Sequence, residues 1–86
     1  MSEAAPDAAP VLVTGATGFF GSHLAAVLAR RGHRVRVLAR RTSDLSRLAG
    51  LEVEIAYGDV RDPGSLRRAA EGRRFVFHSA AILVSV

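Results

Sequence analysis

The fold is decided by residues 11–21, which read VLVTGATGFFG. The apolar run of residues 11–14 ends at a glycine, as expected for a short strand buried on both faces of a sheet. Apolar residues then recur at helical spacing: Phe20, Leu24, Val27 and Leu28. Gly32 is placed to end that helix. The stretch therefore predicts a strand, a glycine-rich turn and a helix.

The rest of the chain continues this alternation. Further strands are expected at residues 35–39, 53–57 and 75–78, and helices at residues 43–49 and 63–71. Strands and helices that alternate with short connections favour an α/β fold in which right-handed crossovers build a parallel sheet. The order is βαβαβαβ. Because a complete doubly wound domain continues beyond a fourth strand, we expect an incomplete one here.

The amino-acid composition limits the kinds of functional site that the chain can form. The chain has 86 residues and no cysteine, which excludes disulfides, thiolate metal sites and a cysteine nucleophile. Three isolated histidines predict no zinc cluster, so we expect no metal site. All twelve basic residues are arginine and the net charge is +4, which favours phosphorylated ligands, nucleic acid or acidic surfaces as partners. The alternative is a solvated, arginine-rich surface.

The first ten residues are small, proline-rich and acidic, and we interpret residues 1–10 as a flexible arm rather than a signal peptide. No apolar stretch reaches the length of a membrane span. We therefore expect a cytoplasmic protein with no membrane partner.

The glycine-rich turn carries the strongest chemical signal. Gly15 would permit the sharp turn after the strand, and Gly18 would let backbone amides approach a pyrophosphate. Gly21 would let the helix pack closely on the sheet, while the helix N-terminus offers N–H groups to the phosphates. The alternative is a turn that is purely structural.

The stretch TGATGFFGSHL resembles the Thr-Gly-x-x-Gly-Phe-x-Gly fingerprint of extended short-chain dehydrogenases/reductases. That group includes the NAD-dependent epimerase/dehydratases and the dihydroflavonol-reductase-like enzymes. The segments VRVLARRTSD, YGDVRDPGSL and FVFHSAA agree, so the resemblance covers about residues 11–81. It implies a Rossmann-type sheet of strand order 3-2-1-4, with residues 11–86 forming an NAD(P)-binding domain that stops after the fourth strand.

The resemblance also implies a set of cofactor-binding residues: Gly15, Thr17, Gly18, Phe19, Phe20, Gly21, Arg40, Arg41, Asp59, Val60, Ala80 and Ala81. In similar proteins, the residue at Asp59 accepts a hydrogen bond from the adenine amino group and the residue at Val60 lies against the ring. Small residues at Ala80 and Ala81 leave room for the ribose and pyrophosphate. The alternative for Asp59 is a loop cap, and His78 is expected to be hydrogen-bonded and partly buried rather than catalytic.

The end of the second strand bears on the choice of cofactor. NAD-binding proteins usually place an acid there for the ribose hydroxyl, but residues 34–41 contain none. Arg40 and Arg41 stand there instead, and a guanidinium can pair with a 2′-phosphate. We therefore favour NADP over NAD, with Asp44 assigned to the first turn of the next helix. The alternative is that both arginines are solvated or that one stacks on adenine.

Catalytic residues of the family do not transfer to this chain. Relatives use a Tyr-x-x-x-Lys pair, but the only tyrosine here is Tyr57, Arg61 stands four positions later, and the chain has no lysine. We interpret the chain as the NAD(P)-binding N-terminal segment of an epimerase/dehydratase-like oxidoreductase, inactive alone, whose parent acts on a nucleotide sugar or a carbonyl compound. The alternative is a non-catalytic NADP(H) sensor or interaction module.

The sequence also bears on macromolecular partners. The arginines are scattered without interleaved exposed aromatics, which disfavours a nucleic-acid binder. The apolar residues 82–86 and an open edge of the fourth strand favour association with a further chain.

Calorimetry can measure the contribution of Arg40 to the choice between NADP and NAD. We expect NADP to bind at least several-fold more tightly than NAD, because a guanidinium pairs with the additional phosphate. Arg40→Glu should erase the difference. Equal affinities in the unaltered protein would contradict the argument.

Overall fold

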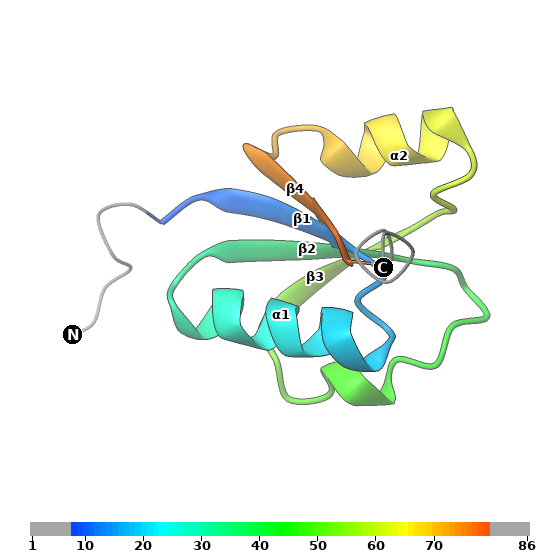
Figure 1. Cartoon of the computed structure of the whole chain (residues 1–86). Helices are drawn as coiled ribbons and strands as arrows, with labels where there is room; N and C mark the ends of the chain where they lie inside the picture. The colour runs from blue at the N-terminus through cyan, green and yellow to red at the C-terminus, as the bar shows by residue number, and fades with distance from the viewer. Residues whose placement is uncertain (1–7, 80–86) are drawn as a thin grey trace, which may run out of the picture.

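The computed structural model describes residues 8–79, which form a parallel sheet flanked by helices (Figure 1). In chain order the elements are β1 (Pro10–Thr14), α1 (Phe19–Arg30), β2 (Arg34–Ala39), the 3₁₀ helix η1 (Ser46–Leu48), β3 (Val53–Tyr57), α2 (Pro63–Ala70) and β4 (Phe75–His78). The four strands lie in the order β3-β2-β1-β4, all parallel, which confirms the predicted topology.

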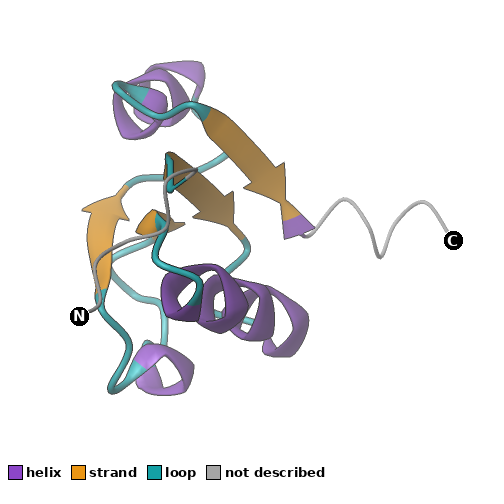
Figure 2. Cartoon of the chain, turned by 90° about the vertical axis from the view of Figure 1, so that its left-hand side faces the viewer, coloured by secondary structure: helices purple, strands orange, loops and turns teal. Residues whose placement is uncertain are grey.

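The helices cover opposite faces of the sheet (Figures 1 and 2). α1 and η1 lie on one face, and α2, which joins β3 to β4, lies on the other. Right-handed crossovers require this division, because the chain moves outward from β1 to β3 and then returns past β1 to β4. The carboxyl ends of all four strands therefore share one edge, at the right of Figure 1.

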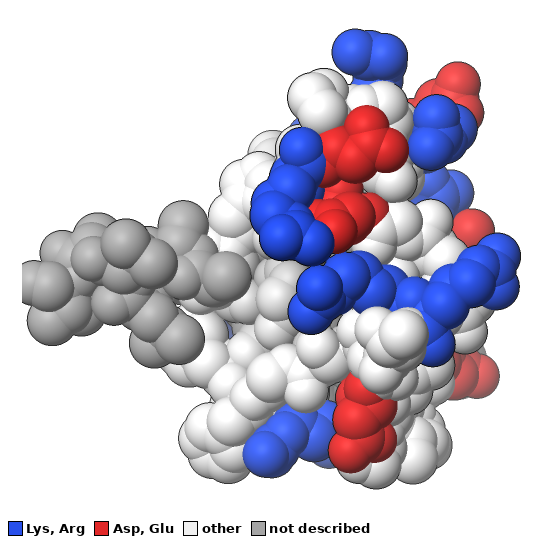
Figure 3. Space-filling model, turned by 90° about the vertical axis from the view of Figure 1, so that its right-hand side faces the viewer, with Lys and Arg blue, Asp and Glu red and all other residues white. Residues whose placement is uncertain are grey.

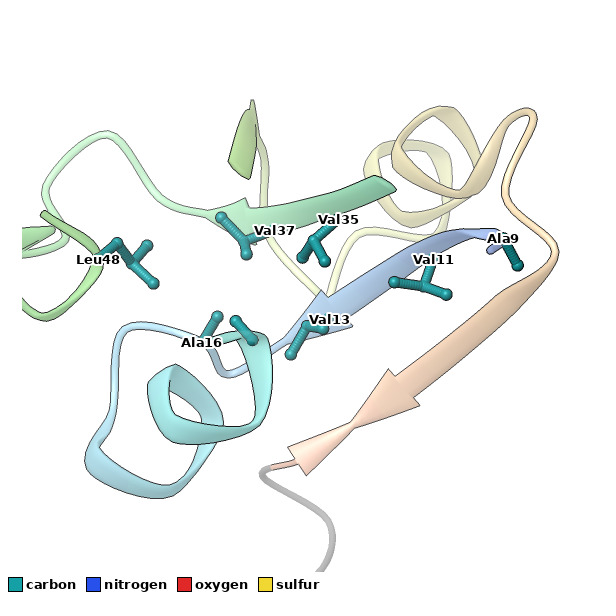
Figure 4. Packing of buried hydrophobic residues seen from close by; sticks show 8 residues of the cluster. Ala9, Val11, Val13, Ala16, Val35, Val37 and Leu48 are labelled. Atoms are coloured by element: carbon teal, nitrogen blue, oxygen red, sulfur yellow. The ribbon is translucent and has the colours of Figure 1, made fainter. Parts of the chain in front are cut away.

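The larger core lies between the sheet and α1 (Figure 4). Alternate residues of the two central strands supply it: Val11, Val13, Val35 and Val37. Leu48 of η1 joins them, and Leu24 and Leu28 of α1 pack against the cluster. Because side chains alternate across a strand, Leu12 and Leu38 point to the opposite face, where they meet Ala69 of α2.

Arg36 follows the same alternation and places a charge on the otherwise apolar α2 face of β2. Its Nη1 donates to the carbonyl oxygens of Ala69 at 2.7 Å and Glu71 at 3.0 Å. These carbonyls belong to the C-terminal end of α2, where backbone acceptors lack helical partners and the helix dipole favours a cation. Nε lies 3.2 Å from Glu54 Oε1, as an ion pair rather than an aligned hydrogen bond. Arg36 thus fastens the end of α2 to the sheet.

The structure corrects the helix expected at residues 43–49. Only the single turn Ser46–Leu48 forms, and neither Thr42 nor Ser43 caps it. Asp44 Oδ1 instead accepts the N–H of Ser46 at 3.0 Å, so Asp44 precedes the turn rather than belonging to it. One turn is sufficient to bury Leu48, and helices this short gain little from further hydrogen bonds.

β4 forms one edge of the sheet. It pairs with β1, and no other described strand lies on its far side. Phe75 is 52% exposed and Val76 is 40% exposed, although both belong to an apolar strand. Within residues 8–79 the outer edge of β4 is therefore unpaired, as predicted. Of the predicted arm at residues 1–10, Ala9 is buried in the core and Pro10 begins β1, so these two residues do not belong to a flexible arm. Residues 1–7 and 82–86 lie outside the described residues.

The role of Arg36 can be measured by urea unfolding. Arg36→Met should lower the free energy of unfolding by about 1–3 kcal/mol, because two carbonyls at the end of α2 lose a charged donor. Arg67→Met, an exposed arginine of the same helix, removes the same charge and should change stability little. Equal stability of the two variants would show that the contacts of Arg36 contribute nothing.

Candidate functional site

A hollow of about 340 Å³ opens at the carboxyl ends of the strands, where the loops after β1, β2 and β3 meet. Figure 3 views the molecule from this side and shows that arginine and acidic side chains lie next to each other on this face. Five of the twelve predicted site residues line the hollow: Gly15, Thr17, Arg40, Asp59 and Val60. The topology thus brings together residues from three separate loops.

The glycines of the turn have different structural roles. Gly15 has a φ of 74°, in the left-handed region that favours glycine, and it turns the chain out of β1. A Cβ on Gly21 would collide with the carbonyl oxygen of Gly15 and would come within 2.6 Å of Ser79 Oγ. Gly21 therefore brings α1 against the turn itself and against the residue that follows β4, which refines the predicted packing on the sheet.

Gly18 has no such steric requirement within the chain. Its backbone is extended, with φ −84° and ψ 175°, a conformation open to any residue. A Cβ there would lie 3.6 Å from the Gly15 carbonyl oxygen, an ordinary van der Waals contact. Nothing among the described residues requires a glycine at this position.

The two helices begin differently. α1 has no side chain that accepts a hydrogen bond from its first turn and no acidic residue in that turn. In α2, Asp62 Oδ1 accepts the N–H of Gly64 at 3.1 Å, and a proline follows the cap, as predicted. The first-turn donors of α1 therefore remain available to an anion at the glycine-rich turn. Phe19 and Phe20, predicted site residues, contribute backbone there, and the two residues are 74% and 46% exposed.

Side chains at the end of β1 and β4 tie these strands together beside the turn. The buried Thr14 shares a 3.0 Å hydrogen bond between its Oγ1 and His78 Nδ1. Ser79 Oγ donates to the carbonyl oxygen of Thr14 at 2.7 Å. His78 is hydrogen-bonded, as expected, but it is exposed rather than partly buried, because β4 is an edge strand. Ala80 and Ala81 lie outside the described residues.

The two predicted arginines occupy different surroundings. Arg40 is exposed at the rim of the hollow, and its backbone N–H donates to Ser43 Oγ at 3.1 Å. The guanidinium of Arg41 stacks over the ring of Tyr57, 4.6 Å from its centroid. This stack places Arg41 in a neighbouring hollow of about 280 Å³ that Arg40 and Asp59 also line. It also engages the only tyrosine of the chain.

Asp59 is held by the residue two positions later. Arg61 donates to Asp59 Oδ1 from its backbone N–H at 2.9 Å and from Nε at 3.1 Å, and to Oδ2 from Nη2 at 2.7 Å. These hydrogen bonds, together with the nearby charges of Arg61 and Arg40, hold the pKa of the Asp59 carboxyl well below its ordinary value. The carboxylate is therefore ionised at neutral pH and can only accept hydrogen bonds.

Three residues of the site were not predicted from the sequence: Gly58, Arg61 and Ser65. A Cβ on Gly58 would come within 3.1 Å of Leu38 Cδ1 and would collide with Ser65, so this glycine sets how closely α2 approaches β2. Ser65 Oγ in turn accepts the N–H of Asp59 at 3.3 Å. A glycine directly after a strand and a serine in the next helix turn were the available signals. Arg61 carried no signal, because its partner is set by the loop conformation.

Within residues 8–79, no set of three or more histidine and acidic side chains is arranged to hold a metal ion. Over the same residues, neither helix has the length and apolar character needed to cross a bilayer. The arrangement at the carboxyl edge can instead receive an anion at the α1 N-terminus and a hydrogen-bond donor at Asp59.

Comparison with known proteins finds relatives that are similar to this chain over most of its length. The chain is 51% identical over 72 residues to the sterol demethylase protein B of Methylococcus capsulatus, covering 84% of this chain and 22% of that protein. It is 44% identical over 73 residues to the ceramide reductase of Caulobacter vibrioides, covering 85% of this chain and 23% of that protein. The chain thus spans about a fifth of the length of these relatives.

Solved structures are similar over the same segment. The crystal structure of gox2253 is 54% identical with a TM-score of 0.76, covering 80% of this chain and 21% of that chain. AtPrR2, solved with NADP⁺ and (+)pinoresinol, is 25% identical with a TM-score of 0.71, covering 84% of this chain and 26% of that chain. WbmG of Bordetella bronchiseptica, solved with NAD, is 27% identical with a TM-score of 0.71, covering 85% and 25%. Similar folds therefore carry either dinucleotide.

The model of one family, described as the NAD dependent epimerase/dehydratase family, matches residues 11–86. The match begins one residue inside β1 and includes the glycine-rich turn and the loops that form the hollow. The chain belongs to the NAD dependent epimerase/dehydratase family.

Proposed function

We propose that this chain binds NADP(H), or NAD(H) less tightly, as the N-terminal segment of an epimerase/dehydratase-like oxidoreductase. The proposal rests mainly on the backbone conformation and the open surroundings of Gly18. Its extended backbone and open surroundings give no steric reason for a glycine within residues 8–79. Gly18 is nevertheless the N-cap residue of α1, where it offers no side chain to the first-turn N–H groups. A side chain at that position would instead occupy the space through which a pyrophosphate reaches the backbone N–H groups.

The turn provides the anion site. Backbone N–H groups of residues 19–21 lie at the positive end of the α1 dipole, and an anion there gains typically about 0.3–1 kcal/mol from the dipole alone. Gly15 and Gly21 contribute by shaping the turn, and Thr17 lines the adjoining hollow. Ala80 and Ala81 are proposed, from the family resemblance, to leave room for the ribose and pyrophosphate.

The hollow receives the adenosine part of the dinucleotide. Its walls include Asp59, which is ionised and accepts hydrogen bonds, and Val60, which is 50% exposed. An adenine ring would place its amino group at Asp59 and a face against Val60. Burial of that half-exposed valine by a ring would add hydrophobic stabilisation.

Preference for NADP is supported by Arg40. It lies at the rim of the hollow directly after β2, where an acid would be needed to bind the ribose hydroxyls of NAD. Arg41 is stacked on Tyr57, so it would have to leave that ring to pair with a phosphate. Arg40 is therefore proposed as the main partner of a 2′-phosphate, and Arg41 as a secondary one.

The chemistry of the whole protein is a further part of the proposal. When bound, the nicotinamide supplies or accepts a hydride, and residues 8–79 contribute by binding and orienting the dinucleotide. The chain has no lysine, and Tyr57 is stacked under Arg41 in β3, so neither half of a Tyr-x-x-x-Lys pair is available here. We propose that residues 11–86 are the dinucleotide-binding part and that the substrate, a nucleotide sugar or a carbonyl compound, is recognised by other residues.

Alanine substitutions of three glycines test the proposal. Gly18→Ala should change the free energy of unfolding by no more than about 1 kcal/mol, because its Cβ fits. Its affinity for NADP⁺ should nevertheless fall about tenfold or more, since the methyl group blocks the pyrophosphate. Gly21→Ala should lower the free energy of unfolding by about 1–3 kcal/mol, because its Cβ collides with backbone. Urea unfolding and calorimetry measure the two effects.

Gly64→Ala provides the matched control. Gly64 lies in the first turn of the other α-helix, α2, and a Cβ there would be 3.4 Å from the end of the Arg68 side chain. Its dinucleotide affinity should equal that of the unaltered chain. Undiminished NADP⁺ affinity in Gly18→Ala would contradict the proposed function.

A further inference from the structure

Arg61 is engaged with Asp59 more completely than a surface ion pair requires. Its side chain is 76% exposed, yet both Nε and Nη2 point to the same carboxylate, at 3.1 Å and 2.7 Å. Exposed ion pairs contribute little to stability, so fold stability does not account for this geometry. Both residues line the hollow at the carboxyl edge of the sheet.

The hydrogen bonds leave a defined acceptor on Asp59. A carboxylate offers about four lone-pair positions, two on each oxygen. Oδ1 accepts from the backbone N–H and from Nε of Arg61, while among the contacts of residues 8–79 Oδ2 accepts only from Nη2. The backbone N–H of Asp59 is itself fixed by Ser65. Oδ2 is therefore the oxygen with an acceptor position still open, and Arg61 prevents the carboxylate from rotating.

We propose that Arg61 is a positioning residue that sets base specificity: it fixes the Asp59 carboxylate so that Oδ2 accepts from a 6-amino purine and rejects a 6-oxo purine. The inference rests on the proposed dinucleotide function and extends it to a residue outside the predicted site. A fixed acceptor meets an N–H donor on adenine but faces a second acceptor on hypoxanthine. A carboxylate that is free to rotate can turn away from the 6-oxo group and bind water instead. Such a carboxylate discriminates less between adenine and hypoxanthine.

The test compares two ligands on the full chain by calorimetry, NADP⁺ and its analogue with hypoxanthine in place of adenine. The unaltered chain should bind NADP⁺ about tenfold more tightly than the analogue. Arg61→Gln, which keeps the backbone N–H contact but loses both guanidinium contacts, should reduce this ratio to about threefold or less. The ratio is informative because a general loss of positive charge weakens both ligands equally.

Arg67→Gln is the matched control, since it removes the same charge from an exposed arginine of α2 and should keep the tenfold ratio. Asp59→Asn should abolish the preference, and Asp59→Asn combined with Arg61→Gln should show no further loss, because Arg61 acts only through Asp59. Circular dichroism checks that each variant is folded.

The outcomes separate the two proposals. A preserved tenfold ratio in Arg61→Gln, or additive losses in the double variant, would overturn the role of Arg61 while leaving dinucleotide binding intact. Unchanged discrimination between the two ligands in Asp59→Asn would also overturn the role of Arg61, because it would show that Asp59 is not the acceptor that reads the base. Failure of the unaltered chain to bind either ligand would contradict the proposed function itself.

Discussion

The site depends on a close approach between the first turn of α1 and the turn that leaves β1. Gly21 lies against the carbonyl oxygen of Gly15 and the hydroxyl of Ser79, with no space for even one carbon. Ser79 in turn donates to the carbonyl of Thr14, so the ends of β1 and β4 and the start of α1 form one packed unit. This contact brings the uncapped end of α1 to the carboxyl edge of the sheet, where Asp59 and Arg40 also lie.

A second set of contacts positions the other side of the hollow. Arg36 fastens the C-terminal end of α2 to the sheet, and Gly58 allows Ser65 near the other end to approach β2 and hold the backbone of Asp59. The orientation of Asp59 thus depends on how α2 packs against the sheet, although no residue of α2 lines the 340 Å³ hollow. Residues far from the ligand therefore shape the geometry that a base would meet.

Much of the fold could be predicted because its signals are local. Apolar runs ended by glycine mark the strands, and the paired Asp62 and Pro63 mark the start of α2. The prediction of a helix at residues 43–49 was wrong, because one turn is enough to pack Leu48 against the core. The contacts of Arg36 could not be predicted, since an arginine in a buried strand gives no indication of which carbonyls it will reach. The same holds for Arg61, whose partner depends on the path of the loop.

The stack of Arg41 on Tyr57 has an optical consequence. The chain contains one tyrosine and no tryptophan, so fluorescence excited at the long-wavelength band of tyrosine, where its four phenylalanines do not absorb, comes from a single ring. That ring borders the hollow shared by Arg40 and Asp59, and a cation rests over its face. Any movement of the guanidinium away from the ring changes the environment of the fluorophore. The protein therefore carries a built-in emission probe beside the proposed adenosine site.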